Sequence, residues 1–412
     1  MSDGAKTKDA APPLPTGLSL TALDPVYRDT PHVYLDRLRD EEPVHFDAQL
    51  GRYILTRYEH VAEVLRDRSM SADPRKANEG TFHRMIFLST GDYEPTILTL
   101  DDPDHRRIRG LVTQAFNQRA VDAMRPRIKE ITNQLLDPVA GKAEFDLVDI
   151  LAAPLPTIVI AEMLGVDPAD QAQFKRWSDC VASSFNPLLS QEEKAKLNEA
   201  DEALRDYFAR IIEERRGRRG SDLVSQLVGI QESGETLKTS EIIGTCILLL
   251  TAGNLTTTDL IGNAIVALLQ NPAQLAAYKA KPELITNVVE EVLRFDGPVA
   301  NSGRVATCPY SVGGISISKG ESVGVSLAAA AHDPAVHSDP HRFDVARNDP
   351  RHVAFGGGAH FCLGAPLARA EAQIAIAEVF GKFPALRFAD KPLERKSIPV
   401  FNGWKEIWVQ PR

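Results

Sequence analysis

The residues best suited to chemistry lie at 355–364, where a cysteine follows a glycine-rich turn. The glycines at 356–358 permit backbone angles that larger side chains forbid, so the chain can fold back on itself there. The next segment, 365–369, begins like a helix, which would place the Cys362 sulfur at a helix N-terminus. Free amides and the helix dipole favour a thiolate at that position, and a thiolate can bind a haem iron. A buried structural cysteine is the alternative.

The residues that flank the cysteine favour the metal-binding interpretation. Phe355, Gly358, Cys362 and Gly364 fill the pattern F-x-x-G-x-x-x-C-x-G, which resembles the haem-binding loop of the cytochrome P-450 superfamily. The resemblance runs from about Leu23 to the C-terminus and implies a triangular, mainly helical haem-thiolate fold. It also implies haem b (iron protoporphyrin IX) as cofactor, with the cysteine as the iron ligand and the other three residues around the haem.

A pair of opposite charges lies on a predicted helix. Glu291 and Arg294 are one helical turn apart, and such a pair is usually a surface ion pair. The pair also resembles the E-x-x-R pair of the same superfamily. The superfamily's third partner is an arginine in a P-x-R-F segment, which Arg342 supplies here within 340–343. Because two guanidinium groups can satisfy one buried carboxylate, we expect this trio to brace the cysteine loop.

Four polar residues match the positions at which the superfamily holds the two haem propionates. His105 and Arg109 lie one helical turn apart, Arg304 begins a predicted strand, and His360 precedes the cysteine by two residues. Each of them alone is typical of a surface or capping residue. Two carboxylates in a pocket of low dielectric constant need cationic or donor partners, which this set would provide.

A long apolar pattern at 240–269 predicts a buried central helix. It carries Gly253, Asn254, Leu255 and Thr256, in a segment that resembles the superfamily's oxygen-binding motif, A-G-x-(D/E)-T-T. The resemblance implies that Thr256 lies beside bound oxygen. Gly253 would let another group approach the backbone closely.

This helix departs from the superfamily pattern at Leu255, which stands where the motif has an acid. An apolar side chain cannot relay a proton. Asn254 and Asp259, one helical turn beyond Leu255, are the candidate substitutes. We expect the missing acid to leave haem binding unaffected but to make proton delivery to the bound oxygen less efficient.

The resemblance also suggests which residues surround the substrate. By position, the candidates are Met85, Phe87, Leu248, Ala252, Ala300, Val400 and Phe401. These residues are apolar, so we expect an apolar substrate, although ordinary core packing is the alternative interpretation.

The activity implied by the resemblance is that of a soluble bacterial-type monooxygenase, which inserts one oxygen atom from O₂ into an organic substrate by hydroxylation or dealkylation. The chain has no convincing G-x-G-x-x-G fingerprint for a flavin or nicotinamide. Electrons would therefore come from a ferredoxin and its NAD(P)H-dependent reductase. Residues 105–130 hold seven basic residues against two acidic ones, which could form a docking surface joined by Arg369, or a solvated helix face.

Two other functions stay open. Leu255 prompts the hypothesis of an enzyme driven by peroxide instead of a redox partner. The second hypothesis is a non-catalytic haem-thiolate binder or sensor.

Composition sets the wider limits. A net charge of −9 over 412 residues does not suit nucleic-acid binding. The four cysteines are far apart and form no C-x-x-C pair, which favours a reducing compartment. Without a signal peptide or an apolar run of about 18 residues, we expect no membrane span and a cytoplasmic protein. We expect a disordered extension at 1–17 and one domain at 18–412.

Periodicity predicts a mainly α fold with a minor β region. Helices are expected at 31–40, 58–66, 123–136, 156–164, 170–183, 191–215, 240–269, 283–295 and 366–380, with another opening near 100–105. Strands are expected at 304–307, 310–312, 315–317 and 322–325, with a hairpin at 44–55 and a closing hairpin at 398–409. The stretch 69–98 has no clear period, which is typical of functional loops, and carries apolar residues that could cover a ligand.

Overall fold

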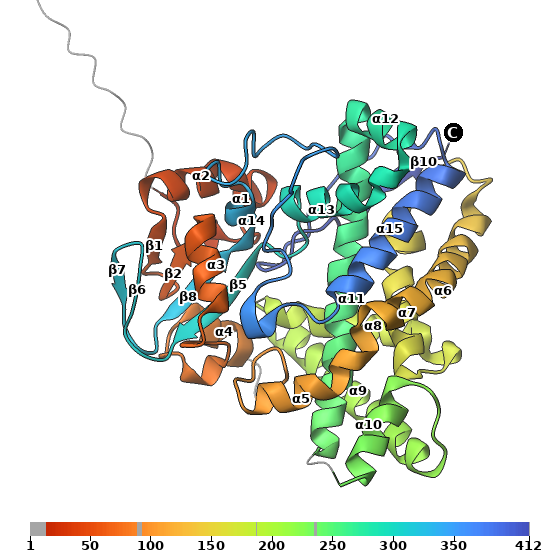
Figure 1. The fold of residues 1–412 in the computed structure, drawn as a ribbon, viewed down its shortest axis with the longest axis horizontal. Helices are drawn as coiled ribbons and strands as arrows, with labels where there is room; N and C mark the ends of the chain where they lie inside the picture. The colour runs from red at the N-terminus through yellow and green to blue at the C-terminus, as the bar shows by residue number, and fades with distance from the viewer. Residues whose placement is uncertain (1–13, 89–92, 187, 235–236, 412) are drawn as a thin grey trace, which may run out of the picture.

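The computed structural model describes residues 14–88, 93–186, 188–234 and 237–411. Helices dominate and the strands are short, as predicted. The long helices gather on one side of the molecule and the largest sheet lies on the other (Figure 1). Most of the predicted extension at 1–17 lies outside the described residues. Gly17 is described and buried, and its amide donates to Asp47 Oδ1 at 2.9 Å.

The helices have the following bounds: α1 Pro25–Asp29, α2 Pro31–Glu41, α3 Tyr58–Arg66, α4 Phe82–Leu88, α5 Asp104–Val112, α6 Gln118–Leu136, α7 Pro154–Leu164, α8 Gln171–Ala182, α9 Gln191–Gly217, α10 Leu223–Glu232, α11 Thr239–Gln270, α12 Pro272–Ala280, α13 Ile285–Phe295, α14 Leu327–Ala331 and α15 Ala365–Lys382. The predicted helices are confirmed to within a few residues at each end. Within the aperiodic stretch 69–98, the prediction missed the short helix α4.

The strands are β1 Val44–Asp47, β2 Arg52–Leu55, β3 Met70–Ser71, β4 Phe145–Asp146, β5 Asn301–Ala306, β6 Tyr310–Val312, β7 Ile315–Ile317, β8 Ser322–Ser326, β9 Arg387–Phe388 and β10 Trp408–Gln410. The largest sheet has the order β1-β2-β8-β5-β3, in which β2 and β8 are parallel and the other pairs antiparallel. The predicted hairpin at 44–55 is confirmed as β1 and β2, joined through Gly51 at a φ of 56°.

The predicted closing hairpin at 398–409 is wrong. Only its last residues form a strand, β10, which pairs with the distant strands β4 and β9. The residues before β10 make only isolated bridges, such as Val299 with Phe401. An alternating pattern indicates a strand but does not identify its partner, and here the partners are far away in sequence.

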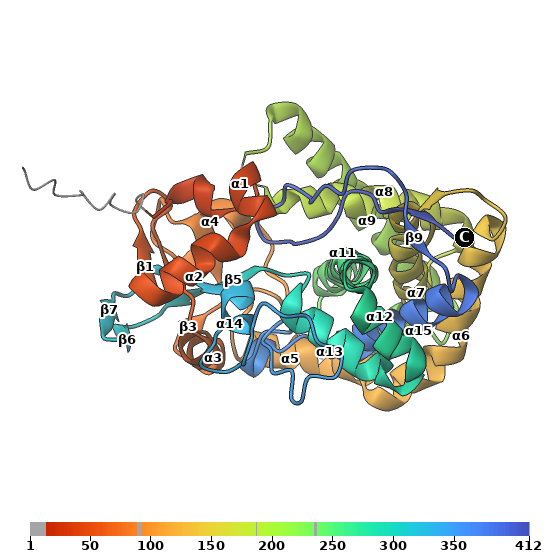
Figure 2. The ribbon, with the colours of Figure 1, turned by 90° about the horizontal axis from the view of Figure 1, so that it is seen from above.

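Helix α11 runs through the middle of the helical region and packs against α7, α9 and α15. Seen nearly along its axis, it is surrounded by other helices (Figure 2). Among the described helices, α11 alone is long and apolar enough to cross a membrane. Its central position explains that composition, because a helix buried on most sides is apolar all round.

Candidate active site

Cys362 lies in a tight turn that leads into α15. Gly356 and Gly358 have φ angles of 70° and 63°, and the Cys362 amide donates to the Phe355 carbonyl oxygen at 2.9 Å. A Cβ on Gly358 would lie 2.6 Å from the Leu65 carbonyl oxygen at the end of α3. Only glycine fits there, so the loop folds back on itself in the way that its glycines predict.

The Cys362 sulfur has amide donors but is shielded from water. The amides of Gly364 and Ala365 point at the sulfur, and Arg109 and Arg369 lie near it. Burial outweighs these groups and raises the pKa of the Cys362 thiol. The amides at the helix N-terminus do favour the thiolate, as predicted, but their effect on the pKa is smaller than that of burial. A bound metal cation would reverse the balance, because it is the thiolate that binds metals.

The four predicted propionate partners come together beside this loop. The rings of His105 and His360 have centroids 4.3 Å apart. Burial lowers the pKa of His360 to about 4, helped by Arg304, His105 and Arg109. Burial likewise lowers the pKa of Arg304 to about 10. This cluster concentrates positive charge and hydrogen-bond donors at one edge of the site.

The cluster and the cysteine loop fit the two parts of a haem. His105 Nε2 is buried and has no hydrogen-bond partner among the described residues. An incoming carboxylate would satisfy it and the buried Arg304 guanidinium. The space beside the Gly364 backbone, close to Cys362, is open. A Cβ built on Gly364 would have no described protein atom within 4 Å, apart from atoms of its neighbours in the chain. A flat ring can therefore approach the backbone there.

The carboxylate of Glu291 on α13 accepts from two arginines. Arg294 Nε and Nη2 each donate to one of its oxygens at 2.8 Å, and both side chains are buried. The second guanidinium belongs to Arg347, whose Nε lies 3.2 Å from both oxygens. The prediction of Arg342 is therefore wrong: its side chain is 62% exposed and points towards Asp344. Buried Phe343 takes the inward position, so its neighbour faces solvent.

The Glu291 cluster holds the segment that precedes the cysteine loop. Arg294 Nη1 donates to the carbonyl oxygens of Ala331 at 3.0 Å and Pro340 at 2.8 Å. Arg347 Nη1 donates to the Ser338 carbonyl oxygen at 2.8 Å. These bonds fix the course of the chain from the end of α14 towards the loop.

Glu290 links α13 to the segments on both sides of the cysteine loop, a role that no sequence pattern indicated. Its carboxylate accepts from Arg369 at 2.6 and 2.8 Å and from His352 at 3.1 Å. The Arg369 guanidinium lies 4.5 Å from the centroid of the Phe355 ring. The only sequence signal for Glu290 is its place beside Glu291, because its partners are distant in the chain.

We expect acid to weaken this link. Burial alone would raise the pKa of Glu290, but hydrogen bonds from Arg369 and His352 lower it to about 2. A lowered pKa stabilises the fold above the ordinary value near 4.5, and this stabilisation is lost as the pH falls towards 2. Glu290→Gln should reduce the free energy of unfolding at neutral pH and flatten its decline below about pH 4.5. Urea unfolding across that range measures this, and an unchanged pH profile would contradict it.

The α11 segment turns one face to a cavity and the other to the core. The Thr256 hydroxyl donates to the Ala252 carbonyl oxygen at 2.7 Å, and both residues line the cavity with Leu255. Gly253 packs against Ile160 of α7 instead. Asn254 is buried, and its Nδ2 donates to Ser178 Oγ at 3.2 Å. Neither Gly253 nor Asn254 is among the residues that line the cavity.

The other candidate acid, Asp259, is engaged elsewhere. Its carboxylate is buried and accepts from Lys396 Nζ at 2.7 Å. Burial raises its pKa. Asp259 does not line the cavity, and none of the described residues that do is acidic. Among the described residues, no cavity-lining carboxylate stands in for the acid that Leu255 replaces.

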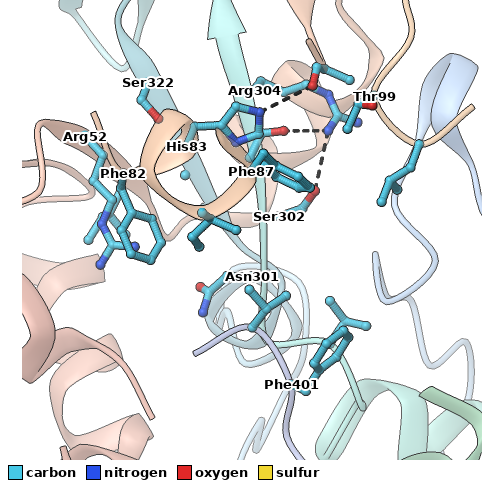
Figure 3. A pocket seen from close by; sticks show the side chains of 18 of the residues that line it. Arg52, Phe82, His83, Phe87, Thr99, Asn301, Ser302, Arg304, Ser322 and Phe401 are labelled. Atoms are coloured by element: carbon cyan, nitrogen blue, oxygen red, sulfur yellow. Dashed lines mark hydrogen bonds between the residues drawn. The ribbon is translucent and has the colours of Figure 1, made fainter. Parts of the chain in front are cut away.

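The cavity of about 280 Å³ extends from α11 to the sheet and the N-terminal helices. Figure 3 shows Arg304 and His83 on one side of it, Phe401 across from them, and Arg52 beside Phe82 at one end. The lining is largely apolar, as predicted.

The predicted pocket residues are mostly in this lining: Phe87, Leu248, Ala252, Val400 and Phe401. Two predictions are wrong. Met85 is on α4 but outside the lining and 36% exposed, and Ala300 lines a second cavity. His83 and Arg52 also line the cavity, although no sequence pattern indicated it, because polar residues on a predicted strand or irregular segment give no sign that they face a cavity.

Ion pairs neutralise much of the predicted basic surface at 105–130. The pairs are Arg106 with Asp102, Arg107 with Glu241, Arg125 with Asp122, Arg127 with Glu162, and Lys129 with Glu378. Arg109 turns inward to the Phe361 carbonyl oxygen. Exposed Phe361, beside the cysteine, and exposed Arg119 are the features of this face best placed to meet a partner.

Comparison with known proteins gives a consistent result. A family model described as Cytochrome P450 matches residues 12–280 and 277–398. The chain is 37% identical to "Cytochrome P450 107B1" of Saccharopolyspora erythraea, over 95% of this chain and 98% of that protein. It is 37% identical to "Cytochrome P450 monooxygenase PikC" of Streptomyces venezuelae, over 98% and 95%. The solved structure of the myxobacterial cytochrome P450 CYP267B1 in complex with myristic acid matches with a TM-score of 0.87 at 33% identity, over 95% and 98%.

Proposed function

Because the chain belongs to the cytochrome P450 family, whose members are haem-thiolate oxidoreductases, we propose that it binds haem b and inserts one oxygen atom from O₂ into an apolar organic substrate. The bound haem supplies an iron centre at which O₂ can be activated. The observation that carries the proposal is the half-buried Cys362, which lies two residues after His360 of the cationic cluster, in a structure that also has an apolar cavity lined by α11 and Arg304.

Each part of the site has a role in this proposal. Cys362 ligates the iron, and the Gly364 and Ala365 amides hold the thiolate in place. The propionates are held by His105, Arg109, Arg304 and His360. Phe355 and Gly358 shape the cysteine loop that would face the haem, and Glu290 and Glu291 hold the segments that flank this loop.

A ligand screen tests the activity. Purified protein is titrated with hydroxylatable apolar compounds, and displacement of iron-bound water is followed as a shift of the haem spectrum. Compounds that produce the shift are then incubated with O₂, NADH, a ferredoxin and its reductase, and the products are analysed. Oxygenated product that depends on both O₂ and the electron donor supports the proposal, and shifts without any product would count against it.

Proton delivery in this proposal depends on the Thr256 hydroxyl and water. The hydroxyl already donates to the Ala252 carbonyl oxygen, so its lone pairs face the cavity and can hold a water molecule there. No described acid lines the cavity. That observation favours a second candidate function, in which hydrogen peroxide supplies the oxygen and its protons together. Turnover with hydrogen peroxide, compared with turnover on ferredoxin and reductase, separates the two.

The substrate in this proposal is mainly apolar but carries one acidic or hydrogen-bond-accepting group, which would lie at the end of the cavity where Figure 3 shows Arg52. Arg52 lines the cavity there, under the ring of Phe82 at 4.2 Å. Its charge is balanced by buried Asp47, 3.4 Å away, but its Nη2 has no hydrogen-bond partner among the described residues. A buried donor without a partner costs stability unless a ligand satisfies it.

We expect Arg52→Gln to weaken binding of a long-chain fatty acid by about tenfold or more, because a hydrogen bond to a charged group contributes roughly 1.5–3 kcal/mol. The uncharged methyl ester of the same acid is the matched ligand and should lose much less affinity than the acid, because its hydrogen bond to Arg52 is not charge-assisted on the ligand side. Spectral titration measures both affinities. An equal loss for acid and ester would mean that Arg52 supports the pocket without recognising the charge.

Electrons in this proposal come from a ferredoxin that docks near Cys362, on the face that presents Phe361 and Arg119. The protein would act in the cytoplasm, where its four cysteines, which form no disulfide in the structure, stay reduced. Because ion pairs occupy most of the basic side chains on this face, we expect only a moderate dependence of the reduction rate on salt.

A further inference from the structure

Three histidines from distant parts of the chain meet at the edge of the second cavity. His32 lies on α2, His332 follows α14, and His341 lies in the loop towards the cysteine. One ligand nitrogen of each lies within 4.8 Å of the other two. The ring centroids of His32 and His332 are 3.8 Å apart, and those of His332 and His341 are 5.0 Å apart. All three line a cavity of about 350 Å³.

Each ring has a nitrogen that is free to bind a ligand. His32 Nδ1 is buried and has no hydrogen-bond partner among the described residues. His332 Nδ1 lies 3.1 Å from the Ala328 carbonyl oxygen, so it carries the proton and leaves the Nε2 lone pair available. His341 Nε2 lies 2.8 Å from Asp36 Oδ2, which leaves the Nδ1 atom of His341 available to bind a metal. A carbonyl or carboxylate behind the ring is the usual support of a metal-bound histidine.

The buried arginine of the Glu291 cluster positions two of these rings. Arg294 Nη1 donates to the carbonyl oxygens of Ala331 and Pro340, the residues directly before His332 and His341. The backbone at both histidines is therefore fixed by the same guanidinium. Preorganised ligands lose less conformational entropy when they bind a metal than mobile ones do.

The two inner rings are shielded from water, since His332 is buried and so is the Nδ1 atom of His32. Neutral imidazole is the form that binds metals. Three imidazoles packed together with an unused buried nitrogen are hard to explain by packing alone, since each buried polar atom without a partner carries a cost.

We propose that His32, His332 and His341 form a binding site for a divalent cation of the zinc type, separate from the haem. Zinc binds imidazole at about 2.0–2.1 Å, which places tetrahedral nitrogens about 3.4 Å apart. His341, whose side chain is 48% exposed, can turn inward to reach that spacing. The fourth position would face the cavity and hold water. The bound ion would join α2 to the segment that Arg294 holds.

The test uses the full-length holoprotein without a histidine tag, stripped with a chelator and passed through gel filtration. Zinc affinity is measured by competition with a chromophoric chelator, and the zinc content per chain by elemental analysis. We expect about one zinc per chain, and a loss of affinity of about 100-fold or more in His341→Ala. The melting temperature of the wild type, but not of His341→Ala, should rise with zinc.

Arg342→Ala is the matched control, because Arg342 is the exposed neighbour of His341 and its side chain is outside the histidine cluster. This variant should bind zinc like the wild type. Absence of tight zinc binding by the wild type would overturn the proposal. So would His341→Ala with unchanged affinity and stoichiometry, which would place any bound zinc elsewhere. None of these readouts requires oxygenase activity, so the proposed function can fail independently.

Discussion

Replacing Arg294 by lysine is expected to give protein that retains little haem. The guanidinium makes two bonds to Glu291 and three to the carbonyl oxygens of Ala331, Pro340 and Arg342. Lysine keeps the charge but lacks the planar fork, so it leaves several buried acceptors unsatisfied. We expect a loss of about 3 kcal/mol or more in the free energy of unfolding. Haem content per chain and urea unfolding of the same preparation measure the effect.

The two other arginines provide the comparison. Arg347→Ala should also reduce haem content, because Arg347 contacts both oxygens of the buried Glu291 carboxylate. Arg342→Ala should be close to wild type, because its side chain faces solvent and only its backbone carbonyl takes part. An Arg342→Ala protein that loses haem while Arg347→Ala keeps it would contradict the structure. Arg294→Lys with a normal haem spectrum and stability would contradict the proposed bracing role.

The second large effect is expected from Leu255→Glu. This change puts a carboxyl group into the cavity lining next to Thr256, where no described acid is present. Burial would raise its pKa towards neutrality, where a carboxyl group can both donate and accept a proton. Positioned proton donors commonly contribute 10²–10⁴-fold to a rate. If proton supply limits turnover, we expect at least about a tenfold rise in the rate of oxygenated product formation, together with a larger share of the electrons ending in product.

Leu255→Gln is the matched control, since glutamine has nearly the shape of glutamate but cannot titrate. Leu255→Gln should form product no faster than the wild type. The affinity of this variant for apolar ligands shows whether the substitution has changed the pocket itself. The measurement compares product with NADH consumed under saturating ferredoxin and reductase. Equal coupling in wild type, Leu255→Glu and Leu255→Gln would mean that another proton route, such as water held by Thr256, already suffices.

Local patterns predicted most of the elements and much of the site. The apolar run of α11, the glycines before Cys362 and the spacing of Glu291 and Arg294 each depend on neighbours within a few residues, so the sequence displays them directly. The clustering of His105, Arg109, Arg304 and His360 could be anticipated only through the family resemblance, because nothing local connects α5, β5 and the cysteine loop.

The predictions that were wrong concern the direction of side chains and the choice of distant partners. The P-x-R-F pattern contains Arg342, yet the fold turns that side chain outward and uses Arg347. Periodicity showed that β10 is a strand but not that β4 and β9 pair with it. The sequence also did not predict that basic residues at 105–130 pair with distant acids such as Glu241 and Glu378. A charge count along the chain does not include partners that are close only in the folded protein.

The central claim is that the sulfur of Cys362 ligates a haem iron, and its most direct test is the absorption spectrum of the reduced protein under carbon monoxide. The account predicts a Soret band shifted far to the red in the wild type, as thiolate ligation requires, and its loss in Cys362→Ala. A wild-type protein that lacks the shifted band, or a Cys362→Ala protein that keeps it, would contradict the account.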